Sequence, residues 1–142
     1  MTDNCLIDTS IIVYAFDAAE PLKRGQSKTF IEARLDDENV YISNQVFAEL
    51  FHVLTSVMRS PLPKEQAETI VRGFVDSPAW KKITYTSATV VRAMHLSKQF
   101  RVDFWDSLIA ATMIENDVFT IYTENEKDFR KIPLLKVVNP LK

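Results

Sequence analysis

Three acidic residues lie where apolar segments of the sequence meet polar ones. Asp8 directly follows one short apolar segment, Glu49 lies a few residues after another, and Asp106 opens the strongly apolar segment 104–114. Carboxylates brought together repel one another, and burial beside apolar side chains adds to the free-energy cost of their charge. A divalent cation removes that cost, and carboxylate oxygens are ligands that Mg²⁺ and Mn²⁺ prefer. These residue types therefore predict a metal site formed by Asp8, Glu49 and Asp106.

Hydroxyl side chains stand near the same positions. Ser10 and Ser107 are close neighbours of two of these acids, and Thr123 opens the polar segment 123–128. We expect these hydroxyl groups to hydrogen-bond the carboxylates or the waters of a bound cation. Such a cation would lower the pKa of a water molecule and neutralise the charge of a phosphodiester transition state. The predicted chemistry is hydrolysis of a phosphodiester.

Each of these acidic segments also has an ordinary interpretation. Taken alone, Asp8 is typical of a turn or helix-capping acid, Glu49 of a solvated helix residue, and Asp106 of an acid in a first helical turn. The segment 124–128 is typical of a charged loop. The metal site is favoured because several separate segments deliver oxygen ligands together, and not because of any one residue.

Strands and helices alternate along the chain, and their order determines where the acids should lie. Apolar segments predict strands at 5–7, 40–43, 81–86, 119–123 and 135–138. The spacing of apolar residues predicts helices at 11–16, 26–35, 45–58, within 61–75, at 87–100 and at 104–116. Ser10 and Asn44 are the expected caps of the helices at 11–16 and 45–58.

This alternation predicts an α/β fold with helices on both faces of a central, mainly parallel sheet of about five short strands. Ligands of such folds bind beyond the carboxyl ends of the strands. We therefore expect the acids that follow the strands to meet at one edge of the sheet.

Length and composition bound the class of protein. The 142 residues fit a single domain, 1–142, and 46% hydrophobic residues provide a core. Cys5 is the only cysteine, which excludes an intrachain disulfide and fits a reducing compartment. Because the sequence shows neither a signal peptide nor an apolar run long enough to span a membrane, we expect a soluble cytoplasmic protein. With only two glycines, a P-loop and a dinucleotide-binding motif are excluded.

The formal net charge of −2 is no general signature of nucleic-acid binding, so attraction to a nucleic acid would depend on local groups. Phe104 and Trp105 offer rings for base stacking, although their place beside an apolar helical segment favours core packing. The basic residues that could contact phosphate, or be ordinary surface charges, are Lys23, Arg24, Lys28, Lys127, Arg130 and Lys131.

Two other classes of protein also place acids near a metal. Glu49 and His52 have the spacing of half a di-iron carboxylate site, but the second copy of the pair is missing. A signalling domain that accepts a phosphoryl group on aspartate would need a second acid beside Asp8 and a lysine after its last strand. Here Lys136 precedes the valines of that strand. Both classes are therefore disfavoured.

Four segments carry the most specific pattern in the chain. They are LIDTSIIVYAFD at 6–17, ISNQVFAELFHVL at 42–54, FWDSLIAATMIENDVFTIYTEN at 104–125 and KVVNP at 136–140. In order and spacing they resemble the PIN-domain nucleases, in particular the VapC-like toxins of type II toxin–antitoxin systems. The resemblance implies a PIN-like three-layer α/β/α sandwich and a metal-dependent endoribonuclease.

The resemblance also implies roles for individual residues. Asp8, Glu49 and Asp106 match the three core acids of the family, which are catalytic and hold Mg²⁺ or Mn²⁺. Ser10 matches the small hydroxyl residue of the first motif. In the implied mechanism, Asp8 and Asp106 bind the cation and Glu49 completes its shell or orients the attacking water, leaving 5′-phosphate and 3′-hydroxyl ends.

The fourth acid of the family falls in YTENEKD at 122–128, where this sequence departs from the pattern. Asn125 stands at the position that often carries aspartate, with Asp128 and Glu124 as alternatives. An asparagine keeps a carbonyl oxygen but removes one negative charge, which favours one cation over two.

The partners implied by the resemblance are an RNA substrate of the transfer or ribosomal class, a cognate antitoxin protein that inhibits the enzyme, and a second copy of the chain in a homodimer. Two alternatives stay open. One is a catalytically weak PIN-like module that binds RNA or protein, and the other is a nuclease outside any toxin–antitoxin pair.

Overall fold

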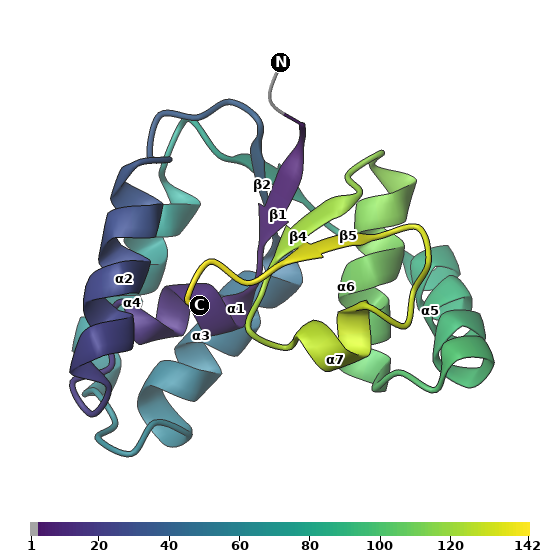
Figure 1. Ribbon diagram of the computed structural model, residues 1–142. Coiled ribbons are helices and arrows are strands. Elements are labelled where there is room, and N and C mark those ends of the chain that lie inside the picture. Colours follow the sequence, from purple (N-terminus) through teal and green to yellow (C-terminus); the bar gives the residue numbers. More distant parts are fainter. Residues whose placement is uncertain (1–2) are drawn as a thin grey trace.

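The computed structural model describes residues 3–142, and its centre is a sheet of five short parallel strands (Figure 1). In sequence order the strands are β1 (Cys5–Ile7), β2 (Val40–Ser43), β3 (Lys81–Ile83), β4 (Thr120–Tyr122) and β5 (Lys136–Val138). Their spatial order is β3-β2-β1-β4-β5, and every neighbouring pair is parallel. The predicted parallel α/β sheet is confirmed, although the third and fourth strands are shorter than the predicted 81–86 and 119–123.

Helices cover both faces of this sheet. They are α1 (Thr9–Tyr14), α2 (Pro21–Glu32), α3 (Asn44–Ser56), α4 (Lys64–Val75), α5 (Ser87–Phe100), α6 (Phe104–Glu115) and α7 (Glu126–Phe129). In Figure 1, α2 and α4 lie on one side of the sheet and α5 and α6 on the other. Helix α1 packs against α2 and α3, and α3 packs against α4, so these helices form one layer. Helices α5 and α6 form the other layer, and the sheet between them completes the three-layer sandwich expected from the sequence.

Helix α6 is apolar on nearly all sides because it has neighbours on nearly all sides. Ile109 and Met113 join the main core with the strands, whereas Leu108 packs with α5 around Ala93. Ala110 belongs to a third cluster with residues that follow α5 and α7. A helix that is hydrophobic all round is one that is enclosed all round.

Two helix caps differ from the prediction. Asp8 caps α1 in place of Ser10, and its carboxylate accepts from the backbone N–H of Thr9 at 2.8 Å. Ser43 caps α3 in place of Asn44, and its hydroxyl accepts from the backbone N–H of Val46 at 3.2 Å. A capping residue keeps an extended backbone, which Asp8 and Ser43 have at the strand ends, whereas Ser10 and Asn44 are already helical.

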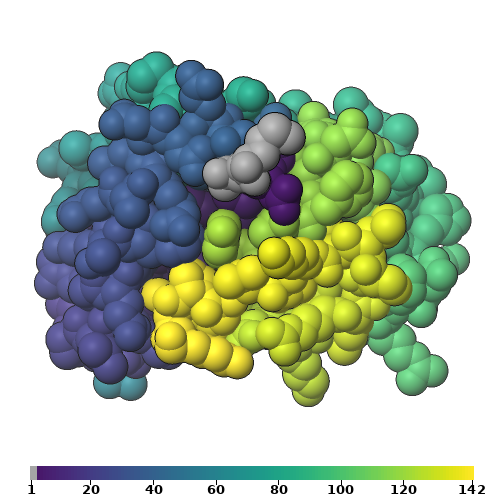
Figure 2. Space-filling model, turned by 45° about the horizontal axis from the view of Figure 1, so that its top comes forward, coloured from purple at the N-terminus to yellow at the C-terminus, as the bar shows by residue number. Residues whose placement is uncertain are grey.

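Two further boundaries also differ. Helix α2 begins at Pro21, five residues before the predicted helix at 26–35, because proline is well suited to a first helical turn. The segment 124–128, typical of a charged loop, instead overlaps the short helix α7. The chain then passes through β5 and its last residues return across the surface toward α2 (Figure 2). Lys142 there forms an ion pair with Glu126 of α7, with 2.8 Å between Nζ and Oε2.

The helices of residues 3–142 are all too short or too polar to cross a lipid bilayer.

Candidate active site

A cleft of ≈ 570 Å³ opens at the carboxyl end of the sheet, where β1 and β4 deliver their following residues. Asp8, Glu49 and Asp106 all line it, so three acids that are far apart in sequence meet at one place. They come from the end of β1, from α3 and from the first turn of α6. This is the edge at which ligands of parallel sheets bind.

Asp8 is the most enclosed of the three acids, with 6% of its surface exposed. One carboxylate oxygen accepts from the N–H of Thr9, and the other accepts from the hydroxyls of Thr123 at 2.7 Å and Ser10 at 3.4 Å. The parallel pairing of β1 with β4 places Thr123 beside Asp8. Burial raises the pKa of Asp8, and these hydrogen bonds oppose that rise.

Glu49 is half-buried and is held by two side chains that sequence reasoning did not identify. Its Oε1 accepts from the Thr9 hydroxyl at 2.8 Å, and its Oε2 accepts from Gln45 Nε2 at 3.3 Å. Burial raises the pKa of Glu49, the bond from Thr9 lowers it, and the charge of Asp8 raises it further. The helical i, i+4 spacing of Gln45 and Glu49 was the available sequence signal for this contact.

Asp106 lies at the start of α6, where the preceding Asp103 caps the helix. The Asp103 carboxylate accepts from the N–H groups of Trp105 at 3.1 Å and Asp106 at 3.4 Å. Burial, followed by the charges of Asp8, Asp103 and nearby Asp128, raises the pKa of Asp106 to about 8. The cleft therefore holds more negative charge than its own side chains neutralise.

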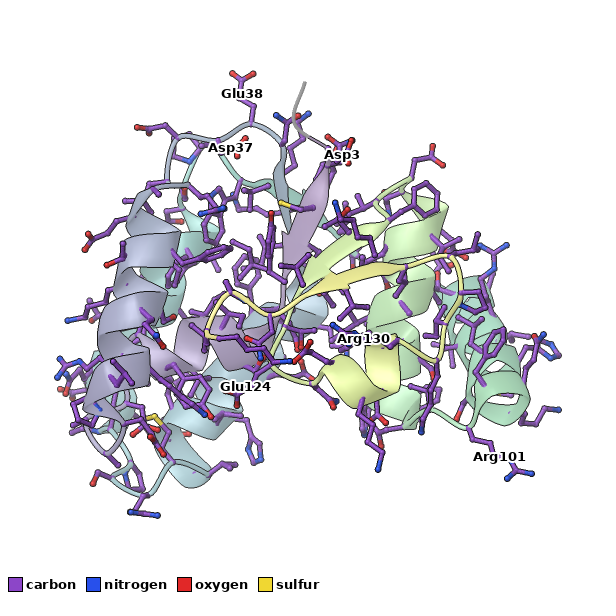
Figure 3. The ribbon with its side chains drawn as sticks, viewed as in Figure 1. Asp3, Asp37, Glu38, Arg101, Glu124 and Arg130 are labelled. Carbon is purple, nitrogen blue, oxygen red and sulfur yellow. The ribbon has the colours of Figure 1, made fainter. Side chains whose placement is uncertain are left out.

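The three candidates for the fourth acidic position lie in different environments. Asn125 Nδ2 donates to Asp106 at 2.7 Å and to Asp128 at 3.3 Å, so it bridges two carboxylates. Glu124 lies beside the end of β4 (Figure 3), where it accepts from the Tyr14 hydroxyl at 2.6 Å and pairs with Lys23 at 2.8 Å. Glu124 is thus neutralised within the protein, whereas Asn125 and Asp128 both lie beside Asp106.

The hydroxyl residues predicted to support the carboxylates are only partly brought together. Thr123 and Ser10 both contact Asp8. Ser107 is fully buried and donates instead to the backbone carbonyl of Val102 at 3.4 Å. Successive residues of a helix are rotated by roughly 100°, so the residue after Asp106 faces away from the cleft.

Three of the six basic residues named from the sequence pair with acids near their own positions. Besides the pair of Lys23 with Glu124, Arg130 pairs with Glu126 at 2.6 Å and Lys131 pairs with Asp128 at 3.5 Å. Arg59, which sequence reasoning did not single out, lines the acidic cleft. It follows α3 in a loop, and nothing in the local pattern marked it as part of the site.

The aromatic pair at the start of α6 divides between core and surface. Phe104 packs against the cluster of Ala93, Leu108 and Ala111, as expected. Trp105 is 56% exposed, so the expectation of core packing is wrong for this residue. Residues 104, 108 and 111 share one helical stripe, and residue 105 lies outside it.

The described residues 3–142 contain no group of three or more His, Cys, Asp or Glu side chains that is ready as it stands to hold a metal ion. Mg²⁺ does not require such a group, because it keeps several of its waters and takes one or two carboxylates. The all-oxygen donor set and its uncompensated negative charge fit this mode of binding.

Comparison with protein families identifies the domain. The family described as "PIN domain" matches residues 5–135, which is nearly the whole chain. No curated protein matches the sequence.

Solved structures share the fold at low sequence identity. The crystal structure of Mycobacterium tuberculosis VapC20, described as a sarcin–ricin loop cleaving toxin, is 17% identical with a TM-score of 0.72, over 91% of this chain and 95% of that one. VapBC2 from Rickettsia felis, bound to a DNA fragment from its promoter, is 24% identical with a TM-score of 0.68, over 95% and 97%. A toxin–antitoxin complex from Klebsiella pneumoniae is 22% identical with a TM-score of 0.66, over 96% and 97%.

Proposed function

Because this chain belongs to the PIN-domain family, we propose that it is a metal-dependent endoribonuclease of the VapC-like toxin type. The observation that carries the proposal is the meeting of Asp8, Glu49 and Asp106 in one cleft at the carboxyl end of the sheet. Structural similarity to VapC20, which is described as a toxin that cleaves the sarcin–ricin loop, supports RNA as the substrate class.

The proposed cofactor is Mg²⁺ or Mn²⁺, held by Asp8 and Asp106 with Glu49 beside them. When bound, such an ion supplies an activated water and stabilises negative charge on the phosphoryl group. The chemistry of the side chains supports it, since the donors are hard oxygens and the pKa of Asp106 is raised by burial and by the charges of neighbouring acids. Asn125 in the fourth position supports one ion rather than two.

The residues of the cleft have separate tasks in the proposed hydrolysis. Thr9, Ser10 and Thr123 fix the Asp8 carboxylate, so that it does not reorganise during the reaction. Glu49, held in place by Thr9 and Gln45, orients the attacking water and accepts its proton.

The attack forms a bond between the water oxygen and phosphorus and breaks the bond between phosphorus and the 3′-oxygen. The 3′-oxygen leaves with a proton from solvent, so the products carry 5′-phosphate and 3′-hydroxyl ends. Arg59, at the wall of the cleft, is placed to contact a backbone phosphate of the RNA.

The proposed partners follow from the toxin type. An antitoxin protein would inhibit the enzyme by covering the acidic cleft and offering a cation to it, and the chain would form a homodimer. The similar Klebsiella structure is a toxin–antitoxin complex, which supports this partner class. Co-expression with the product of an adjacent small gene, followed by purification on a single tag, tests it.

Cleavage of a pool of structured RNAs by the purified protein tests the nuclease itself. We expect cuts with Mg²⁺ or Mn²⁺, none with EDTA, and none from folded Asp8→Asn protein. Mapping of the fragment ends should give 5′-phosphates and identify the RNA. Absence of cleavage with either metal, from folded protein free of any antitoxin, would contradict the proposal and favour a PIN-like binding module.

A further inference from the structure

A second cleft, of ≈ 520 Å³, adjoins the acidic one. It is lined by the beginning of α3, by the loop after β3 and by the first turn of α6. Glu49 and His52 line both clefts, so the two hollows share one wall. A ligand held in the second cleft therefore lies next to the proposed reaction site.

Two exposed aromatic residues define this second cleft. Trp105 is 56% exposed and Tyr85 is 39% exposed, whereas most other large aromatic side chains of the described residues are buried or half-buried. Gln45 Nε2 donates to the backbone carbonyl of Trp105 at 2.9 Å, which holds the main chain of this residue beside the cleft. Its ring also meets the Phe104 ring edge-on, with 5.3 Å between centroids. A held, exposed ring is suited to stacking on a planar ligand.

The Gln45 side chain provides a second, independent observation. Gln45 lines the cleft and is only 7% exposed. Its amide nitrogen faces two acceptors, the carbonyl of Trp105 and the carboxylate of Glu49, which fixes the orientation of the amide. Its Oε1 is left buried with no hydrogen-bond partner among the residues described. A buried acceptor without a donor is unfavourable, and this one belongs to a residue in the wall of the cleft.

The charge of the cleft selects the kind of ligand. The residues that line it include the acid Glu49 and no lysine or arginine. A phosphate group would be repelled there, whereas a nucleobase is neutral, planar and carries N–H donors. We propose that this aromatic cleft, lined by Trp105, Tyr85 and Gln45, binds one unpaired nucleobase next to the scissile phosphate. The inference rests on the proposed nuclease function, because it takes RNA as the ligand.

Binding can be measured without cleavage, which separates the two proposals. Wild-type protein in EDTA and low salt is titrated with a single-stranded oligoribonucleotide and with an abasic oligomer of the same length and charge. Trp80 is 2% exposed, so quenching of tryptophan fluorescence reports on Trp105. We expect quenching by the oligoribonucleotide, and much less by the abasic oligomer.

Three variants locate the effect. Trp105→Ala should weaken binding of the oligoribonucleotide by about fivefold or more, the usual range for loss of one stacked base. Trp105→Phe should keep most of the affinity, because it keeps a ring. Phe119→Ala removes a ring that is 40% exposed at the amino end of the sheet and should leave binding unchanged. Binding is followed by anisotropy, and circular dichroism confirms that each variant is folded.

Equal quenching by the base-bearing and abasic oligomers would overturn the inference, as would an unchanged affinity of folded Trp105→Ala. Absence of any binding by wild-type protein would also overturn it. Loss of binding to a protein partner by Trp105→Ala, with RNA binding intact, would assign the cleft to that partner instead. Base-dependent binding by a protein that never cleaves RNA would support the nucleobase-binding cleft and contradict the proposed nuclease function.

Discussion

Acidic residues gather at both ends of the parallel sheet, but the two groups are built differently. At the amino end, Asp3 and Glu38 are exposed and point outward (Figure 3). At the carboxyl end, Asp8, Glu49 and Asp106 are buried or half-buried around one cleft and are held by hydroxyl and amide groups. Burial raises the pKa of each acid in the second group.

The contrast shows that a group of acidic residues is not by itself a cation-binding site. At the amino end, water solvates each carboxylate, and no neighbouring group is needed. At the carboxyl end, Thr9, Thr123 and Asn125 donate hydrogen bonds to carboxylates that are partly or wholly removed from water. Such an arrangement is unfavourable for stability alone and favourable for binding a cation.

Removing the charge of Asp8 should have the largest effect, because Asp8 is the most enclosed carboxylate at the carboxyl end of the sheet. Asp8→Asn keeps the size of the side chain but loses the charge that holds the cation, so RNA cleavage should fall to the level seen in EDTA. Glu38→Gln removes an acid at the amino end and should cleave like the wild type. Gel assays of RNA cleavage by both variants test this prediction. Full cleavage by Asp8→Asn would show that the Asp8 carboxylate is not needed for the reaction.

Removing a supporting hydroxyl should have the next largest effect. Thr123→Val deletes the 2.7 Å hydrogen bond to Asp8 at nearly constant volume, and cleavage or Mn²⁺ affinity should fall by about 10- to 100-fold. Ser107→Ala is the matched control, since that hydroxyl donates to a backbone carbonyl outside the cleft. Equal effects of the two changes would mean that Thr123 acts only through folding.

Removing Asp106 should stabilise the protein when metal is absent. The folded-state pKa of about 8 lies above the ordinary value of 3.8, so this carboxyl favours folding below about pH 4 and that contribution is lost as the pH rises toward 8. In EDTA at pH 8, Asp106→Asn should raise the melting temperature by about 3 °C or more. Glu38→Gln should leave it unchanged. A lower melting temperature for Asp106→Asn would contradict the repulsion described for the cleft.

Adding an acid should have the smallest effect and the opposite sign. Asn125→Asp replaces the amide that bridges Asp106 and Asp128 with another carboxylate. In EDTA the melting temperature should fall, and Mn²⁺ affinity measured by calorimetry should rise by roughly tenfold or less, about one unit-charge interaction near a surface. A weaker affinity for Mn²⁺ would mean that the amide of Asn125 serves the site better than a charge.

The fold was largely predictable because its signals are local. Alternating apolar segments place the strands at 5–7 and 40–43, and the apolar segment at 104–114 identifies a helix enclosed on all sides. The errors lie at boundaries. Pro21 starts α2 without a side-chain cap, and α7 has only four residues, so neither shows the periodicity on which the prediction depended.

The site was predictable as a set of segments and not as a set of contacts. Its acids follow strands, and their convergence follows from parallel topology alone. Rotation about a helix axis turns Ser107 away from the cleft, and an ion pair with Lys23 draws Glu124 toward α2. Trp105 lies one residue from a buried stripe, and Tyr85 stands in a loop. These outcomes depend on tertiary geometry that no single segment contains.

The hydrogen bond from Thr123 to Asp8 joins residues that are 115 positions apart. During translation Asp8 leaves the ribosome early, and β1 then waits for β4, which comes more than a hundred residues later. A nascent or truncated chain that lacks the residues after 119 has the three acids but not the hydroxyl that fixes the first of them. The cleft is therefore completed only near the end of synthesis, so the order of synthesis itself delays assembly of the proposed active site until the sheet can close around it.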